Sequence, residues 1–500
     1  MLPREACGVV GIASNGPVAL QLYFALRALQ HRGQESAGIA THSDRIRCSK
    51  GMGLVHEVFP DGPAELPGNM GIAHVRYSTT GASKLENAQP VVASSQMGDI
   101  ALAHNGDIVN ADRIRRELKK QGWAFITSTD SEVLIRLLAN EIAPAGDLVR
   151  ATRNLMRMIV GSYSLVVLLP DRILAIRDPL GIKPLCLGRL PGGEGYIAAS
   201  ETVALDVLGA EFVREVNPGE LVELTASGLR SHTILRSSHT AHCMFEWVYF
   251  ARPDSLFAGK YVFDVRWCFG RKVAEEKPVE ADIVVPVPDS GRTHAQGYSE
   301  ASGLPYVEGL MKNRYIGRTF ILPTREAREM NVQLKLNAIR SRVAGKRVVL
   351  VDDSIVRGTT TGKIVELLRR AGATEVHVRI GSPPIRAPCY LGIDMKTRDQ
   401  FVATDRTEAD IARIIGADSV GYLSIDGLVE CIGIPKSDLC LGCLTGEYPL
   451  EIPGERARFQ ARLDDVWPPP SATSQNPFLL IPHAPPDENR EGARARTRSG

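Results

Sequence analysis

The first part of the chain alternates short apolar segments with Gly, Pro, Asp or Asn, which is typical of strands in a sheet-rich domain. These segments are CGVVGIA, GIAHVRYST, IALAHNGDI, YSLVVLLP, RILAIRD and GYIAAS. Apolar residues at helical spacing in Ala19–Gln30 and Asp130–Ile142 predict helices that cover the sheet. We therefore expect a layered α+β domain over residues 7–235.

After about His239 the apolar segments become longer and alternate with helical patterns. Strands are predicted at Asp282–Val287, Arg347–Val351 and Glu375–Ile380, and a helix at Thr359–Ala371. Strands that alternate with helices indicate a parallel sheet. Residues 236–452 should thus form a second domain, which makes the whole chain a two-domain α/β protein.

The longest apolar stretch, Met158–Pro170, is interrupted by polar residues and is shorter than the roughly 20 residues that a bilayer span requires. It predicts a buried strand, and no membrane partner is expected. The leader MLPREA lacks the apolar centre of a secretory signal, so the cytoplasm is the expected location. Residues 453–500 are rich in Pro, Arg, Ala and Ser without periodicity, and we expect a disordered tail.

Composition adds three limits, on domain size, on partners and on the role of the cysteines. A hydrophobic content of 44% and a charged content of 23% over 500 residues are globular values that fit two large domains. The formal charge of +2 gives no overall field that would attract nucleic acid. The cysteine count of 9 is odd and modest, which argues against a disulfide scaffold and leaves catalytic or metal roles open.

The turn after the predicted strand Arg347–Val351 carries candidate chemistry. Asp352 and Asp353 follow the carboxyl end of the strand, where ligands bind in open α/β sheets. Their carboxylates can accept hydrogen bonds from ribose hydroxyls and help to hold Mg²⁺. Small and hydroxyl-bearing residues that suit a phosphate at a helix N-terminus follow them. These are Ser354, Gly358, Thr359 and Thr360.

Two acidic residues and a Gly-Thr run could also form an ordinary solvated turn with a helix cap. The whole string Val348–Thr360, however, resembles the phosphoribosyl-pyrophosphate-binding motif of type I phosphoribosyltransferases. The resemblance implies that this turn binds phosphoribosyl pyrophosphate. Ser290 lies in VVPVPDSGRT, at the end of a second predicted strand. Together with Asp352 and Asp353, it is an expected ligand of Mg²⁺.

The segment Gly309–Glu329 holds several basic residues among glycine and aromatic residues. Such a run is usually a solvated face and occasionally a nucleic-acid patch. Here it resembles the loop that closes over phosphoribosyl pyrophosphate in the same family, which implies that Lys312 and Arg314 bind this substrate. Closure would exclude water from the site.

Cys7 lies in an apolar segment, where a cysteine usually serves packing. Four motifs change that interpretation because together they resemble class II, N-terminal-nucleophile glutamine amidotransferases. They are QHRGQESAGIA, GIAHVRYSTTG, AHNGDI and STDSEV. The resemblance implies an αββα sandwich and removal of residues 1–6 as a propeptide. The new α-amino group of Cys7 would then act as base for its thiol.

The same resemblance assigns roles to the other motif residues. Asn105 and the Gly106 N–H would form the oxyanion hole for the tetrahedral intermediate. Arg76 suits bidentate binding of the glutamine α-carboxylate, and Asp130 would accept from its ammonium group. Arg32 is expected beside the nucleophile, among the glutamine-binding residues. Taken singly, Arg76 could be a surface ion pair and Asp130 a helix cap.

Cysteines in the second domain suggest a metal centre. The pair Cys440-Leu-Gly-Cys443 has a spacing shared by zinc, iron–sulfur and redox sites. With Cys243 and Cys389, it resembles the 4Fe-4S ligands of one subgroup of glutamine phosphoribosyl-pyrophosphate amidotransferases. A structural zinc site is the alternative. For Cys48, Cys186, Cys268 and Cys431 we expect buried packing.

The two halves together resemble this amidotransferase family, which implies the first step of purine biosynthesis: glutamine, water and phosphoribosyl pyrophosphate would give 5-phosphoribosylamine, glutamate and pyrophosphate. Ammonia freed at Cys7 would pass internally to the second site. The resemblance also implies feedback by purine nucleotides and a homotetramer. The alternatives are a glucosamine-phosphate-forming amidotransferase, which should lack VVLVDDSIVRGTT, and a ligand-sensing DNA-binding regulator, which should lack the glutaminase motifs.

Overall fold

A computed structural model of the chain describes residues 7–63, 66–77, 83–145, 147–313, 336–393, 395 and 401–452. The chain divides into two compact units, Met1–Pro453 and Gly454–Gly500, and all described residues lie in the first. The predicted propeptide and the predicted disordered tail therefore lie outside the described residues.

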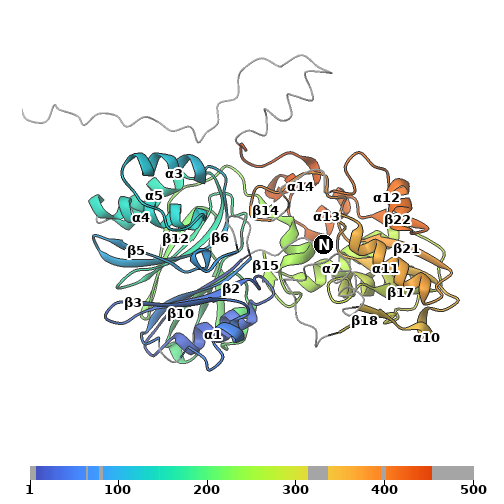
Figure 1. Cartoon of the computed structure of the whole chain (residues 1–500), viewed down its shortest axis with the longest axis horizontal. Helices are drawn as coiled ribbons and strands as arrows, with labels where there is room; N and C mark the ends of the chain where they lie inside the picture. Colours follow the sequence, from blue (N-terminus) through green and yellow to red (C-terminus); the bar gives the residue numbers. More distant parts are fainter. Residues whose placement is uncertain are drawn as a thin grey trace, which may run out of the picture. The chain divides into compact units, whose positions relative to one another are not determined.

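Two antiparallel sheets form the N-terminal half of the described chain (Figure 1). The first sheet has the order β11-β9-β10-β1-β4-β2-β3, and its strands are β1 (Gly8–Ser14), β2 (Ser36–His42), β3 (Ile46–Met52), β4 (Met70–Arg76), β9 (Cys186–Arg189), β10 (Gly195–Ala199) and β11 (Glu211–Glu215). The second sheet has the order β13-β12-β8-β7-β6-β5, and its strands are β5 (Val91–Ser95), β6 (Gly98–Ile108), β7 (Gly161–Leu168), β8 (Ile173–Arg177), β12 (Glu220–Thr225) and β13 (Gly228–Thr233).

Helices cover the outer faces of these sheets. Small and branched residues from both sheets, such as Val9, Ala103 and Val166, share one core between them. Figure 1 shows α3, α4 and α5 on one side of the sheets and α1 on the other. The helices are α1 (Ala19–Ala28), α2 (Val55–Val58), α3 (Ala111–Lys120), α4 (Asp130–Ala145), α5 (Leu148–Met158) and α6 (Val203–Asp206). The predicted αββα sandwich is thereby confirmed.

A parallel sheet organises the second half, in the order β17-β20-β21-β22. Because side chains alternate along each strand, Val349 and Val351 face one core and Val348 and Leu350 the other. The strands are β17 (Ile283–Pro286), β20 (Arg347–Asp352), β21 (Glu375–Ile380) and β22 (Ser419–Tyr422). The helices are α7 (Val262–Glu276), α8 (Arg292–Ser302), α10 (Arg340–Val343), α11 (Thr359–Arg370), α12 (Glu408–Ile415), α13 (Ile425–Ile432) and α14 (Gly442–Thr445). The predicted parallel α/β domain is confirmed.

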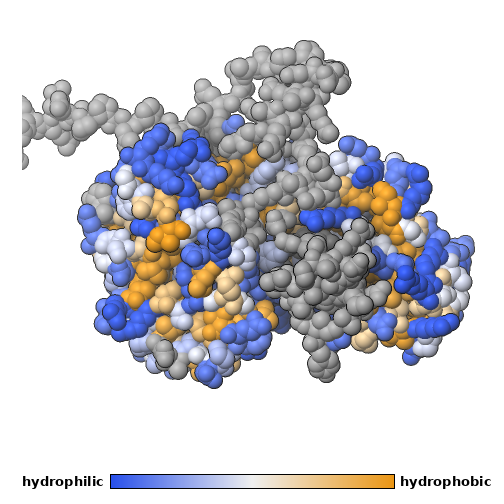
Figure 2. Space-filling view, viewed as in Figure 1, coloured by the Kyte–Doolittle hydropathy of each residue, from blue (hydrophilic) through white to orange (hydrophobic). Residues whose placement is uncertain are grey.

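Short elements complete the described chain. The strands are β14 (His242–Cys243), β15 (Leu256–Phe257), β16 (Lys260–Tyr261), β18 (Leu310–Lys312), β19 (Leu336–Ala338) and β23 (Leu439–Cys440). The single turns are η1 (Leu85–Asn87), η2 (Pro191–Gly193), η3 (Glu246–Phe250), which is a π-helix, and η5 (Lys436–Asp438). On the face drawn in Figure 2, hydrophobic residues of the described chain lie in patches between hydrophilic ones. Among the described residues no helix has the length and apolar content needed to cross a membrane.

The expected strand at Met158–Pro170 is only partly correct. The strand β7 occupies Gly161–Leu168, whereas Met158 is the last residue of α5. The helix α5 has one apolar face, because Arg157 and earlier polar residues occupy the other. Its last residue, Met158, is hydrophobic and lies just before the apolar residues of the strand, so helix end and strand form one apolar run in the sequence.

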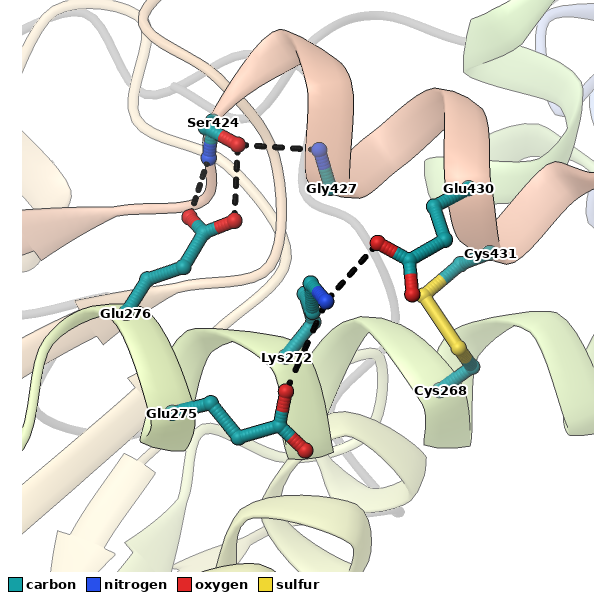
Figure 3. The surroundings of a disulfide bond; sticks show 8 residues. All are labelled: Cys268, Lys272, Glu275, Glu276, Ser424, Gly427, Glu430 and Cys431. Carbon is teal, nitrogen blue, oxygen red and sulfur yellow. Dashed lines mark hydrogen bonds and ion pairs between the residues drawn. A yellow bond between two sulfur atoms is a disulfide. The ribbon is translucent and has the colours of Figure 1, made fainter.

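A disulfide between Cys268 and Cys431 joins α7 to α13, and the two cysteines are 163 residues apart in the sequence (Figure 3). Beside it, Lys272 Nζ lies 2.7 Å from Glu430 Oε2, again between the two helices. The expectation of simple buried packing for Cys268 and Cys431 is therefore wrong, because close approach of the two helices lets the thiols bond to each other.

The other two cysteines expected to serve packing differ from each other. Cys186 is buried in β9, which confirms the expectation. Cys48 lies in the edge strand β3 and is exposed, so the expectation is wrong there. Its Sγ contacts the Pro90 carbonyl oxygen over 3.8 Å, but β3 is the last strand of its sheet and leaves the residue open to solvent.

Candidate functional site

Cys7 directly precedes β1, a central strand of the first sheet. The residue is buried, and its Sγ donates to the carbonyl oxygen of Tyr77 over 3.4 Å. Burial raises the pKa of the Cys7 thiol above its ordinary value. Because the thiolate is the nucleophile, a thiol in this setting needs a nearby base to remove its proton.

The predicted glutamine-binding residues surround this thiol. Arg76 ends β4, and Asp130 begins α4. Both act electrostatically on Cys7, as does Glu35. Arg76 Nη1 lies 2.6 Å from Glu35 Oε1, while Asp130 Oδ2 accepts from the Ile108 N–H over 3.0 Å. The structure thus gathers a cation and two carboxylates around the nucleophile, the charges that an α-amino acid substrate requires.

Asn105 and Gly106 lie side by side in β6, opposite Ser164 and Tyr163 of β7. Asn105 is 1% exposed, and within the described residues neither Nδ2 nor Oδ1 of its side chain has a hydrogen-bond partner. Buried amides are nearly always paired, so the Asn105 side chain has a donor and an acceptor available for a ligand. At Gly106 (φ +153°) a Cβ would lie 1.9 Å from the Ser162 carbonyl oxygen, which explains the glycine.

Arg32 is indeed a neighbour of the nucleophile, but its guanidinium points to protein groups. Nε donates to the Cys7 carbonyl oxygen over 3.0 Å, and Nη1 and Nη2 donate to the two carboxylate oxygens of Glu246, each over 2.9 Å. Nη1 also donates to Glu201 over 2.5 Å. The side chain is fully buried. A direct contact of Arg32 with glutamine stays a prediction, whereas its contact with the Cys7 backbone is observed.

Several charged residues at this site were not predicted from the sequence. His104 Nδ1 lies 3.7 Å from Asp130 Oδ2, and burial lowers the pKa of His104. Glu35 and His104 both lie inside the motifs QHRGQESAGIA and AHNGDI, so their position in those strings could have signalled them. Glu201 and Glu246 lie in segments without such a signal.

The predicted phosphoribosyl cradle lies at the carboxyl end of β20, whose last residue is Asp352. Asp352 and Asp353 are buried, and Gly358 takes a left-handed conformation (φ +75°) just before α11. The Asp353 N–H donates to Asp352 Oδ1 over 2.9 Å, and Ser354 Oγ donates to Asp353 Oδ1 over 2.6 Å. Thr359 and Thr360, also predicted ligands, form the first turn of α11. The hydroxyls and the helix N-terminus therefore lie where an anion would meet N–H groups.

Burial and the adjacent Asp353 raise the pKa of Asp352 well above its ordinary value. Burial also raises the pKa of Asp353, against the lowering effect of Ser290 and Ser354 nearby. Asp353 Oδ2 is buried and has no hydrogen-bond partner among the described residues. Two adjacent buried carboxyl groups with an unpaired oxygen are arranged to receive a cation.

The predicted pyrophosphate side of the cradle is described only in part. Ser290 precedes α8 and, as its effect on Asp353 shows, lies near the carboxyl pair. Lys312 ends β18, and its Nζ lies 2.8 Å from Asp289 Oδ2. Arg314 and the rest of the predicted closing loop to Glu329 lie outside the described residues.

The four candidate cluster cysteines come from three segments, with Cys440 and Cys443 in the same one, and lie near one another. Cys243 pairs with Cys440 where β14 runs parallel to β23. Cys440 and Cys389 both act electrostatically on the Cys443 thiol, and burial raises the pKa of Cys443 well above its ordinary value. Among the described residues, no three His, Cys, Asp or Glu side chains are arranged to hold a metal ion.

Comparisons with known proteins agree with this division. The glutamine amidotransferase domain family matches residues 74–207, and the phosphoribosyl transferase domain family matches residues 264–380. The fold and the two sites thus define a glutamine amidotransferase fused to a phosphoribosyltransferase.

Relatives that match over most of their length identify the family within this class of enzymes. The amidophosphoribosyltransferase of Methanothermobacter thermautotrophicus is 53% identical over 465 residues, 92% of this chain and 97% of the relative. That of Bacillus subtilis is 45% identical over 90% of this chain and 95% of the relative. A solved structure of the B. subtilis glutamine phosphoribosylpyrophosphate amidotransferase, complexed with ADP and GMP, has a TM-score of 0.83 at 43% identity and covers 89% of this chain and 98% of that chain. The chain belongs to the amidophosphoribosyltransferase family, whose reaction is the first committed step of purine biosynthesis.

Asn105→Ala should lower the kcat of the glutamine-dependent reaction by ~10²–10³-fold, the usual effect of losing one oxyanion donor. The reaction with free ammonia should stay within about twofold of wild type, because it does not use this intermediate. Steady-state kinetics with each nitrogen donor measures both.

Asn110→Ala is the matched control. Asn110 is a buried amide that bonds the backbone of Met158 and Val160. Its loss should lower thermal stability without favouring one nitrogen donor over the other. An equal loss of both reactions in Asn105→Ala would contradict the oxyanion role.

Proposed function

We propose that the two sites divide the amidophosphoribosyltransferase reaction between them. Cys7 hydrolyses glutamine to glutamate and ammonia, and the cradle at residues 352–360 joins that ammonia to phosphoribosyl pyrophosphate, which releases pyrophosphate. The observation that carries this proposal is the presence of both sites in one compact unit, each with an unpaired buried group.

At the first site, removal of residues 1–6 would leave the α-amine of Cys7 as the base for its own thiol. The thiolate attacks the amide carbon of glutamine, and the oxyanion receives hydrogen bonds from the Asn105 amide and the Gly106 N–H. Ammonia leaves, and water then hydrolyses the thioester. Arg76 and Asp130 hold the α-carboxylate and α-ammonium groups of glutamine throughout.

At the second site, Asp352 and Asp353 hold the ribose hydroxyls, while Ser354, Gly358, Thr359 and Thr360 hold the 5′-phosphate. Lys312 and Arg314 would contact the pyrophosphate. The unpaired Asp353 Oδ2 fits Mg²⁺, which Ser290, Asp352 and Asp353 would hold with substrate oxygens or water. When bound, Mg²⁺ supplies positive charge against the departing pyrophosphate.

A 4Fe-4S cluster on Cys243, Cys389, Cys440 and Cys443 is a further part of the proposal. Lys183 supports it: its Nζ is fully buried and has no hydrogen-bond partner among the described residues. Burial lowers the pKa of Lys183, but Cys243, Glu246 and Cys389 together raise it above its ordinary value. A cluster with four thiolates is anionic, so this ammonium would offset its charge. When bound, the cluster would act as a structural centre, because neither half-reaction transfers electrons.

Other properties rest on the family alone. Purine nucleotides as feedback inhibitors, a homotetrameric assembly and a cytoplasmic location are proposals that follow from the resemblance. The neighbouring B. subtilis structure contains ADP and GMP, which supports the first of them. The glucosamine-phosphate alternative is disfavoured by the phosphoribosyl transferase match, and the DNA-binding alternative by the glutaminase match.

Cys7→Ala should abolish glutamine-dependent pyrophosphate release and keep the reaction with free ammonia, because only the first site uses the thiol. Asp352→Ala/Asp353→Ala should lose both reactions, since both need the ribose donor. Pyrophosphate release is measured with each nitrogen donor. Glutamine-dependent synthesis by Cys7→Ala would refute the assignment.

Anaerobic purification should yield a brown protein with about four iron atoms per chain, the content of one such cluster. Cys440→Ser should lower the iron content and the visible absorbance. Cys186→Ser, a buried cysteine away from the group, should keep both. Stoichiometric zinc without iron in the wild type would reject the cluster in favour of a zinc site.

A further inference from the structure

A segment without helix or strand, residues 126–129, leads into α4 and ends directly before Asp130. Asp130 is the residue proposed to bind the α-ammonium group of glutamine. Its Oδ2 accepts from the Ile108 N–H at the end of β6, so one side of the carboxylate is already fixed. Where the backbone of Asp130 lies depends on how residues 126–129 are held.

Glu132, in the first turn of α4, turns back to hold the start of this segment. Its Oε1 accepts from the Ile126 N–H over 3.0 Å, and its Oε2 accepts from the Thr127 N–H over 2.6 Å. Burial raises the pKa of the Glu132 carboxyl, but these N–H groups, the Thr127 hydroxyl and Arg136 together bring it below its ordinary value. The carboxylate is therefore ionised at neutral pH, and hydrogen bonds to a charged acceptor are the stronger kind.

Arg115 of α3 holds the carbonyl groups of the same segment. Its Nη1 donates to the Thr127 carbonyl oxygen over 2.7 Å, and its Nη2 donates to the Thr129 carbonyl oxygen. Its guanidinium carbon also lies 4.7 Å from the centre of the Phe125 ring, just before the segment. A guanidinium presents its donors in a rigid planar fork. Two carbonyl oxygens bound to one fork are therefore fixed relative to each other.

Asn87, the last residue of η1, holds the middle of the segment. Its Oδ1 accepts from the Ser128 N–H and its Nδ2 donates to Ser128 Oγ, each over 3.1 Å. The Thr129 N–H donates to the Thr127 hydroxyl over 3.2 Å. Each N–H group of residues 126–129 thus has a protein acceptor. Loops are usually the more mobile parts of a fold, whereas this one is fixed by side chains from three elements.

From these contacts we propose that Arg115 and Glu132 are positioning residues of the glutaminase, which hold residues 126–129 so that Asp130 meets the α-ammonium group of glutamine. The inference rests on the proposed role of Asp130. Both side chains direct their charged groups at the backbone of the segment, so each acts through Asp130 and not on the substrate itself. Their effect falls on recognition of an amino acid, and not on the attack by Cys7.

The first test uses the full-length enzyme with Arg115→Gln, which removes the planar fork. The KM for glutamine should rise ~10-fold while kcat stays within about threefold, the pattern of lost substrate binding. Glu132→Gln keeps the shape of its side chain without the charge and should act in the same direction. Arg115→Lys keeps a cation that can bind one of the two carbonyl oxygens, and it should recover part of the loss. Ammonia-dependent synthesis should stay within about twofold of wild type in all three variants, because it does not use Asp130.

The second test compares glutamine with 4-carbamoylbutanoate, which has the same amide and carboxylate but no α-amino group. The wild type should hydrolyse glutamine with the higher kcat/KM, and Arg115→Gln should reduce this preference ~10-fold, since only glutamine gains from Asp130. Arg214→Gln is the matched control. Arg214 lies in the same half of the chain and donates to the Glu215 carbonyl oxygen and to the Glu220 carboxylate, each over 2.8 Å. Its loss should change neither the preference nor the KM.

Asp130→Asn separates this inference from the proposed function on which it rests. The amide keeps an oxygen for the Ile108 N–H and removes the charge, so the KM for glutamine should rise ~10–100-fold. Arg115→Gln should then add less than about twofold in the Asp130→Asn background, because both changes act through one group. A wild-type KM in Asp130→Asn would refute the proposed role of Asp130 itself.

The other outcomes bear on the positioning residues alone. If Asp130→Asn raises the KM, a wild-type KM in Arg115→Gln or in Glu132→Gln would overturn the inference. An equal loss with 4-carbamoylbutanoate, the same loss in Arg214→Gln, or a fully additive effect in the double variant would also overturn it. Each of these results would mean that the side chains support the fold without directing Asp130.

Discussion

The ion pair between Arg32 and Glu246 is the contact on which the two-site arrangement depends. Both side chains are fully buried, and Glu201 supplies a second carboxylate to the same guanidinium. Removing one partner from such a pair costs about 3–5 kcal/mol, because a charge is left buried and unpaired. Arg32 therefore requires the second half of the chain to be in place before the Cys7 backbone is held where the other glutaminase residues converge.

The two sites differ in how their buried charged residues are arranged. Around Cys7, Arg76 and Asp130 carry opposite charges, as the proposed binding of an amino acid with an anionic and a cationic group requires. In the cradle, Asp352 and Asp353 are buried side by side, and burial raises the pKa of both carboxyl groups. Among the described residues, both sites contain a buried polar side-chain atom without a hydrogen-bond partner, for example on Asn105 at the first and on Asp353 at the second.

The sequence allowed the local parts of this structure to be predicted. The strand, turn and helix around Asp352 follow from neighbouring residues, since period-two and period-3.6 patterns and helix-start signals are all short-range. The glutaminase strands were found for the same reason. Two contacts between distant residues were not predicted: Arg32 and Glu246 are 214 residues apart, and Cys268 and Cys431 are 163 apart. Nothing in the local pattern around Glu246 distinguishes a carboxylate that will be buried from one that stays in solvent.

The central claim is that ammonia made at Cys7 is used at the cradle of the same molecule, and isotope competition tests it most directly. The enzyme is given glutamine labelled with ¹⁵N in its amide, phosphoribosyl pyrophosphate and a large excess of unlabelled ammonium, and the amine product is chemically trapped for mass spectrometry. The account predicts a product far richer in ¹⁵N than the ammonium pool, and an unlabelled product from Cys7→Ala. A wild-type product with the same ¹⁵N content as the pool would contradict it.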